Sequence, residues 1–218
     1  MTREVAPRLR GGVALRAAWL VAGLLLFAVS IVCLYEARLG LSPWDALNQG
    51  ISKHSPLSFG TANIAVGCGV LMLAVVLGSR IGAGTVANAV LVGTFVDLLL
   101  RSHDVNELGQ ASVATRIALL AIGVPLMGVA TALYVGAGFG AGPRDSLMLA
   151  LVRLTGRRVG LVRGVLEASA TLAGFLLGGT VGIGTLVFVV AIGPAVEASF
   201  ALLGRSFLTA PRLLEAST

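Results

Sequence analysis

The sequence predicts an all-α integral membrane protein with six transmembrane helices in two inverted three-helix repeats. The observations behind this fold class are a high apolar content, six apolar runs of membrane-spanning length, and a self-match at a shift of 100 residues. Hydrophobic residues make up 56% of the 218 residues and charged residues only 12%, whereas soluble domains are about a quarter charged. One core cannot bury so much apolar surface, so lipid must solvate the rest.

Each apolar run is long enough for a membrane-spanning helix, which takes about 20 residues. The first run follows a basic N-terminal segment. It is longer than the apolar part of a signal peptide, so we expect it to be retained as a span. The predicted spans are residues 14–37, 59–79, 81–101, 115–137, 159–178 and 181–203, within a single membrane domain covering residues 1–218.

Two further segments begin like helices but are too short to span. Ser42 is a good N-cap, Pro43 suits the first helical position, and Asp45 favours the positive end of a helix. Pro143 and Asp145 repeat this start 100 residues later. At ~1.5 Å per residue, neither segment reaches across a bilayer. Each repeat is therefore expected to contain a short re-entrant or interfacial helix.

The self-match at a shift of 100 residues runs without a gap. Pro43 and Asp45 meet Pro143 and Asp145. A further match sets Asp97 against Glu197. Glycine-rich apolar chains match themselves by chance, but composition does not explain these proline and acid matches. The predicted copies are residues 13–101 and 113–201, joined by a polar linker at 102–112.

Three spans per copy is an odd number, so the second copy must enter the membrane from the opposite side. Basic residues test this inversion, because cytoplasmic loops carry an excess of Lys and Arg. With the N-terminus in the cytoplasm, twelve of the 16 basic residues fall on the inner side. The four on the outer side are Arg38, Lys53, Arg101 and Arg116. Both termini are therefore expected to be cytoplasmic.

Ionisable residues within membrane-embedded segments are costly and need a structural or functional reason. The candidates for substrate or ion binding are Asp45, Asp97, Asp145, Arg163, Glu167 and Glu197. From the topology, we expect Asp45 beside Asp97 on one side of the membrane, and Asp145 beside Glu197 on the other. The alternative is that each acid caps a helix or pairs with a nearby Arg, as Arg144 would with Glu197.

Glu167 lies near the middle of the fifth span, and its counterpart in the first copy is Gly67. Arg163 is one helical turn earlier and is placed to neutralise it. Two interpretations stay open. Glu167 either binds a cation or relays a proton, or it is one half of a structural ion pair.

The two short helices are the other candidate site. Discontinuous helices in paired inverted halves indicate a transport site, and Pro43, Trp44 and Pro143 are expected to gate or line it. Helix N-termini suit anions, but Asp45 and Asp145 partly occupy that field. The alternative is a pair of interfacial helices that only seal the bundle.

No motif indicates an enzyme, a metal site or a cofactor. His54 and His103 lack the spacing of metal ligands, and no Ser, His and Asp arrangement implies a nucleophile. Cys33 and Cys68 lie inside apolar runs and are interpreted as buried small residues. The basic residues lie between the spans, which disfavours nucleic-acid binding.

Residues 40–47, Gly-Leu-Ser-Pro-Trp-Asp-Ala-Leu, resemble the YczE/YitT family of bacterial membrane proteins. The Gly-x-Gly-Thr of residues 82–85 and the acid Asp97 fit the same family, over about residues 13–201. The resemblance is closer to the YczE branch, because the soluble C-terminal domain common in the YitT branch is absent. It implies location in the bacterial cytoplasmic membrane. Some relatives are associated with small-molecule export or secondary-metabolite production.

The leading expectation is a secondary transporter or exporter of a small molecule, coupled to protons. Asp97, Glu167 and Glu197 would bind or relay the cation, and the partners would be the lipid bilayer and a small-molecule or ion substrate. The alternative is a non-transporting membrane factor that supports or regulates a partner enzyme. Small-residue helix faces also permit a homodimer.

Overall fold

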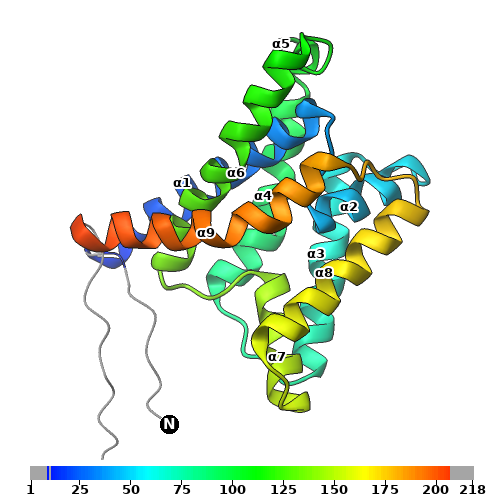
Figure 1. Ribbon diagram of the computed structural model, residues 1–218. Coiled ribbons are helices and arrows are strands. Elements are labelled where there is room, and N and C mark those ends of the chain that lie inside the picture. Colours follow the sequence, from blue (N-terminus) through cyan, green and yellow to red (C-terminus); the bar gives the residue numbers. More distant parts are fainter. Residues whose placement is uncertain (1–8, 10, 207–218) are drawn as a thin grey trace, which may run out of the picture.

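The fold is all-α throughout the part of the chain that the computed structural model describes, residue 9 and residues 11–206 (Figure 1). Six of the helices in that part are long and apolar enough to cross a membrane, which confirms the predicted class. They are α1 (Val13–Ala37), α3 (Phe59–Val76), α4 (Ala83–Leu100), α6 (Val113–Gly136), α8 (Val159–Leu176) and α9 (Ile183–Ser206).

Two of these helices end two or three residues earlier than predicted. Just beyond α3 and α8, Gly78 and Gly178 adopt φ values of 82° and 71°, a left-handed conformation that side-chain-bearing residues disfavour. The amides of the two glycines donate to carbonyls in the last helical turn, those of Val75 and Phe175. The same glycine stop therefore ends both helices.

The two short helices form where they are predicted, as α2 (Pro43–Lys53) and α7 (Pro143–Thr155). Neither is among the spanning helices. In α2, Asp45 and Asn48 are fully buried, while the apolar stripe of Trp44, Leu47 and Ile51 is only half-buried. The polar face of α2 is thus turned into the protein.

The predicted polar linker at residues 102–112 contains α5 (His103–Leu108), a short helix between α4 and α6 that the sequence analysis did not predict. A helix of six residues is too short to produce an apolar periodicity in the sequence.

Hydrogen bonds across the bundle recur at positions 100 residues apart. Arg16 Nε donates to the Ala137 carbonyl at 2.8 Å, and Arg116 Nε donates to the Ala37 carbonyl at the same distance. A second reciprocal pair involves backbone amides. The Gly84 amide donates to the Phe139 carbonyl at 2.9 Å, and the Gly184 amide to the Leu39 carbonyl at 2.8 Å.

A third reciprocal pair attaches each short helix to the other half of the chain. Lys53 Nζ at the end of α2 donates to the Gly178 carbonyl at 2.6 Å. Arg153 Nη2 near the end of α7 donates to the Leu77 carbonyl at 2.7 Å. As a result, α2 packs on α8 and α7 packs on α3. This reciprocity supports the predicted duplication, whose exact boundaries stay a prediction.

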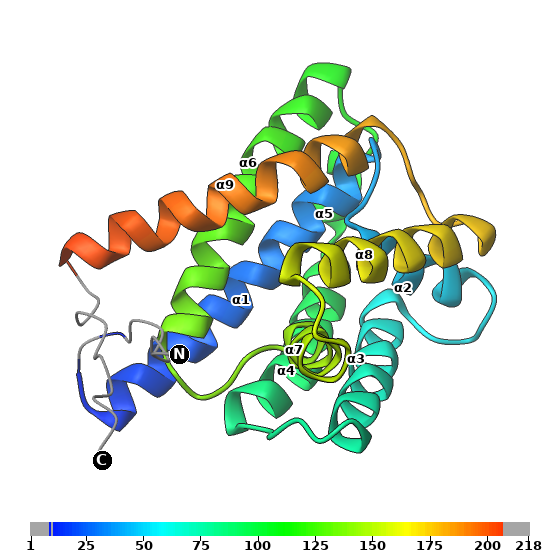
Figure 2. The same cartoon turned by 60° about the horizontal axis from the view of Figure 1, so that its bottom comes forward.

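The two halves differ in how their last two spans pack. α3 and α4 lie side by side, whereas α8 and α9 diverge from the loop that joins them (Figures 1 and 2). In the first half, a Cβ on Gly60 would lie 2.5 Å from the Asp97 side chain, and one on Gly93 would lie 2.6 Å from Ile64. Around the counterparts, Gly160 and Gly193, there is open space.

Candidate functional site: a cavity between the two halves

A cavity of about 160 Å³ lies where the two short helices begin. Pro43 and Pro143, the first residues of α2 and α7, both line it. Much of the lining consists of residues 100 positions apart, so the cavity lies between the two halves of the chain. These pairs are Phe27 with Met127, Ser42 with Gly142, Pro43 with Pro143, Trp44 with Arg144, Asn63 with Arg163, Asn88 with Phe188, and Val92 with Ile192.

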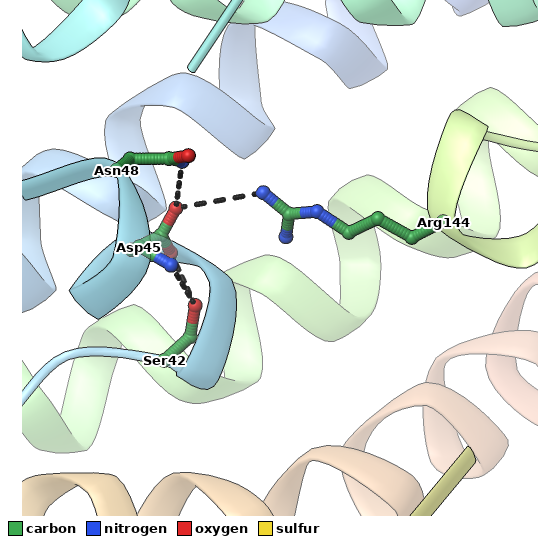
Figure 3. A network of polar contacts seen from close by, with 4 residues as sticks. All are labelled: Ser42, Asp45, Asn48 and Arg144. Atoms are coloured by element: carbon green, nitrogen blue, oxygen red, sulfur yellow. Dashed lines mark hydrogen bonds and ion pairs between the residues drawn. The ribbon is translucent and has the colours of Figure 1, made fainter. Parts of the chain in front are cut away.

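The buried carboxylate of Asp45, at the start of α2, is the centre of a polar network at the cavity (Figure 3). The Ser42 hydroxyl accepts a hydrogen bond from the Asp45 amide at 3.3 Å and donates one to the Asp45 carboxylate. Asn48 Nδ2 donates to the other carboxylate oxygen at 3.4 Å. The Asp45 side chain is 0% exposed, and this burial raises its pKa against the lowering effect of Arg144.

Arg144, the second residue of α7, reaches across the cavity to this carboxylate. One of its terminal nitrogens lies 3.7 Å from Asp45 Oδ1. The guanidinium also lies over the Trp44 ring, 5.2 Å from the ring centroid, in a cation–π arrangement. The two short helices are therefore joined at their N-terminal ends by an ion pair between the halves.

Asp145 borders the same cavity from α7. Its carboxylate accepts a hydrogen bond from the Tyr134 hydroxyl of α6 at 3.2 Å. Burial raises the pKa of Asp145, and the nearest guanidiniums, those of Arg163 and Arg144, act in the opposite direction. Neither guanidinium comes within ion-pair distance of Asp145 in the described part of the chain, because each is paired with another acid.

The fourth and fifth charged groups of the site lie on α8. Arg163 Nε donates to Glu167 Oε1 at 2.9 Å, which is the one-turn pair that the sequence indicates. Their side chains are 50% and 22% exposed, and both residues line the cavity. Glu167 lies halfway along α8, so the cavity reaches the middle of that span.

Asn63 contributes an unpaired donor to the cavity wall. The residue is only 7% exposed, and its Nδ2 atom has no hydrogen-bond partner among the described residues. A buried amide without a partner costs roughly 1–3 kcal/mol. Such a donor is retained at little cost where a ligand or water supplies the acceptor.

The structure brings four of the six predicted ionisable residues to one place: Asp45, Asp145, Arg163 and Glu167 lie in or directly behind the cavity wall. The expected pairing of Asp45 with Asp97 is wrong. Asp97 instead accepts hydrogen bonds from the Gly60 amide at 2.7 Å and from Ser58.

The expected pairing of Asp145 with Glu197 is also not formed. Glu197 is exposed on α9, and α9 diverges from α8 and α7. The alternative partner for Glu197 was Arg144, and this is wrong as well, because Arg144 pairs with Asp45. The predictions failed because topology places residues on a side of the membrane but does not say which helix faces which.

Asn63, Asn88 and Tyr134 are site residues that the sequence analysis missed. Asn63 and Asn88 are amides inside apolar spans, which is the signal that would have indicated them. Among residues 9 and 11–206, no cluster of His, Cys, Asp or Glu suits a metal ion.

The fold and the cavity define a polytopic α-helical membrane protein with a charged cavity between two similar halves. The chain belongs to DUF6198, a family of unknown function, whose model matches residues 14–200. It is 34% identical to an uncharacterized protein of Haemophilus influenzae over 80% of each chain. It is 33% identical to the uncharacterized membrane protein YczE of Bacillus subtilis over 82% of each chain.

A third relative is the uncharacterized protein YyaS of Bacillus subtilis, 28% identical over 87% of this chain and 94% of YyaS. No solved structure matches this chain. The relatives thus support the YczE-like resemblance and membrane location.

Proposed function

We propose that this protein is a secondary transporter that moves a small molecule across the bacterial cytoplasmic membrane by alternating access. One observation carries the proposal: of the two equivalent helix pairs that line the cavity, α3 and α4 pack closely together, whereas α8 and α9 diverge. Two conformations related by exchange of the halves would open the cavity to each side in turn.

The closed side is formed by α3 and α4. Asp97 of α4 accepts hydrogen bonds from the Gly60 amide and the Thr61 hydroxyl of α3, the second at 3.3 Å. In this way it caps the start of α3 with a negative charge, which the helix dipole favours. Gly60 and Gly93 let the two backbones approach closely.

The open side is formed by the matching parts of α8 and α9. In the second half of the chain, the positions equivalent to Gly60, Gly93 and Asp97 are occupied by Gly160, Gly193 and Glu197. All three are exposed. An exposed carboxylate on a span is costly, and capping the start of α8 would remove that cost. The same glycine-lined contact is therefore available to close this side.

The charge distribution supports an assignment of the two sides. In the predicted topology, the start of α8 and the end of α9 lie on the side where α1 begins, and the excess of basic residues favours the cytoplasm for that side. Under this proposal the conformation described is open inward, and both termini are cytoplasmic. The proposal includes no catalytic step, and it applies equally to a monomer or a homodimer.

The competing function is a membrane factor that presents its acids to a partner enzyme. Such a factor would turn its ionisable groups toward the outside of the bundle. Here Asp145 and Glu167 line an internal cavity instead, which favours transport.

The test is flux into liposomes reconstituted with the full chain, together with a cross-link across the open side. In a background with Cys33 and Cys68 replaced by Ala, cysteines are placed at positions 160 and 193. We expect the oxidised pair to abolish flux of protons or substrate, and a reductant to restore it. The single cysteine variants, treated alike, should keep at least half of the flux.

Two results would count against the proposal. Flux that is unchanged by a quantitative cross-link would mean that α8 and α9 do not move during transport. No flux over a broad panel of solutes and proton gradients would favour the non-transporting factor.

A further inference from the structure

The positive and negative charges of the ionisable groups around the cavity are unequal in number. Three carboxylates, those of Asp45, Asp145 and Glu167, face two guanidiniums, those of Arg144 and Arg163. With both guanidiniums in ion pairs, one negative charge is left without a cationic partner. A partly buried charge without a cationic partner is unfavourable, so either a proton or a cation is expected to neutralise it.

The unbalanced acid is Asp145. Arg144 is committed to Asp45 at 3.7 Å and Arg163 to Glu167 at 2.9 Å. Within the described residues, the hydrogen bond to the Asp145 carboxylate comes from a neutral group, the Tyr134 hydroxyl. Asp145 is therefore the acid at which an additional positive charge would be most stabilised.

The remaining wall fits a small organic molecule rather than a bare ion. Trp44, Phe27 and Phe188 supply aromatic surface, which stabilises organic cations through cation–π contacts. Asn63 also lines the cavity, and its 7% exposed amide has a nitrogen without a hydrogen-bond partner among the described residues. An apolar cavity of about 150 Å³ holds benzene, and this one measures about 160 Å³.

We propose that the cavity binds a small organic amine as its cation, with the ammonium group at Asp145, in exchange for the proton that Asp145 carries in the ligand-free state. This inference rests on the proposed transport function and gives it a substrate class. The exchange is balanced: the carboxylic acid releases one proton and the carboxylate then pairs with one ammonium. Because one carboxylate cannot hold both, amine and proton compete, which couples their movement across the membrane in opposite directions.

The sign of the pH dependence follows from the same competition. Amine binding needs the carboxylate, so it is present above the pKa of Asp145 and is lost as the pH falls through it. Burial raises that pKa, and Glu167 acts in the same direction, while Arg163, Tyr134 and Arg144 lower it. The loss of binding is therefore expected at a higher pH than for an exposed aspartate, whose pKa is ~3.9.

The test uses three probes of one shape and different charge: benzylammonium, benzyl alcohol and benzoate. Their binding to the detergent-purified full chain is measured by titration calorimetry. We expect benzylammonium to bind at least tenfold more tightly than benzyl alcohol, and benzoate not to bind. Benzoate binding as tightly as benzylammonium would overturn the proposal in favour of an anion site at the helix N-termini.

Asp145→Asn should weaken benzylammonium binding at least tenfold and abolish its pH dependence, with Glu107→Gln in α5 as a control acid outside the cavity. Unchanged binding in Asp145→Asn would overturn the assignment. Wild-type protein in weakly buffered solution provides a readout that no structural role of Asp145 would give. Benzylammonium should release protons there at a pH near the pKa of Asp145, and binding without release would exclude the exchange.

These experiments distinguish a failure of the proposed amine site from a failure of the proposed transport function. Equilibrium binding of benzylammonium with no flux in liposomes would retain the cation site and remove the transport function. Proton or solute flux in wild-type liposomes without benzylammonium binding would retain transport and remove the amine site.

Discussion

Replacing Arg144 by methionine is expected to lower the free energy of unfolding by about 3 kcal/mol at neutral pH, because it leaves a buried carboxylate without its cation. Asp45 is 0% exposed and Arg144 is its ion-pair partner, at 3.7 Å. Methionine retains much of the length of the Arg144 side chain and removes its charge, together with the cation–π contact of the guanidinium with Trp44. Thermal unfolding in detergent measures the loss.

Two controls separate this effect from general disruption. Arg163→Met removes a guanidinium from a pair that is 50% and 22% exposed, and should cost less than about 1 kcal/mol. Adding Asp45→Asn to Arg144→Met removes the uncompensated charge and should recover most of the lost stability. If the double variant were as unstable as the single one, the ion pair would not be the cause.

Acid is expected to rescue Arg144→Met in part. Burial raises the pKa of Asp45 in the folded protein, and loss of the guanidinium raises it further. A carboxyl with a folded pKa above its unfolded value binds protons more tightly when folded, so stability increases as pH falls through that window. A deficit that does not change with pH would contradict this account.

Adding a single methyl group at Gly60 is expected to destabilise the protein by about 2 kcal/mol, while the same change at Gly160 is not. A Cβ at Gly60 would meet the Gly93 carbonyl and lie 2.5 Å from Asp97 Cγ, and the backbone cannot yield cheaply. The Gly160 site has open space. There, alanine should be neutral or stabilising by up to about 1 kcal/mol through its helix propensity.

The two glycine variants also test the proposed motion. Gly160→Leu should fold normally and lose transport, because it fills the contact through which α8 would close on α9. Equal stability loss in Gly60→Ala and Gly160→Ala would mean that the two halves pack alike, against the asymmetry seen in Figures 1 and 2. Full flux in Gly160→Leu would mean that closure of α8 on α9 is not needed for transport.

The sequence by itself determined the membrane class, the six spans and the two short helices. Spans follow from hydropathy, because lipid demands long apolar segments with internally paired backbones. Ser42, Pro43 and Asp45 predicted the start of α2 through local capping interactions, which depend on near neighbours in the chain. The Arg163–Glu167 pair is also local, one helical turn apart, and could be predicted for the same reason.

Only the tertiary structure decided which acids meet which partners. Asp45 contacts Arg144, 99 residues away, and Asp97 caps α3 rather than joining Asp45. Such contacts depend on the rotation and tilt of packed helices, which periodicity does not specify. The open side is also a tertiary property: Gly60 and Gly160 are the same residue at equivalent positions, yet one is in close contact and the other is free.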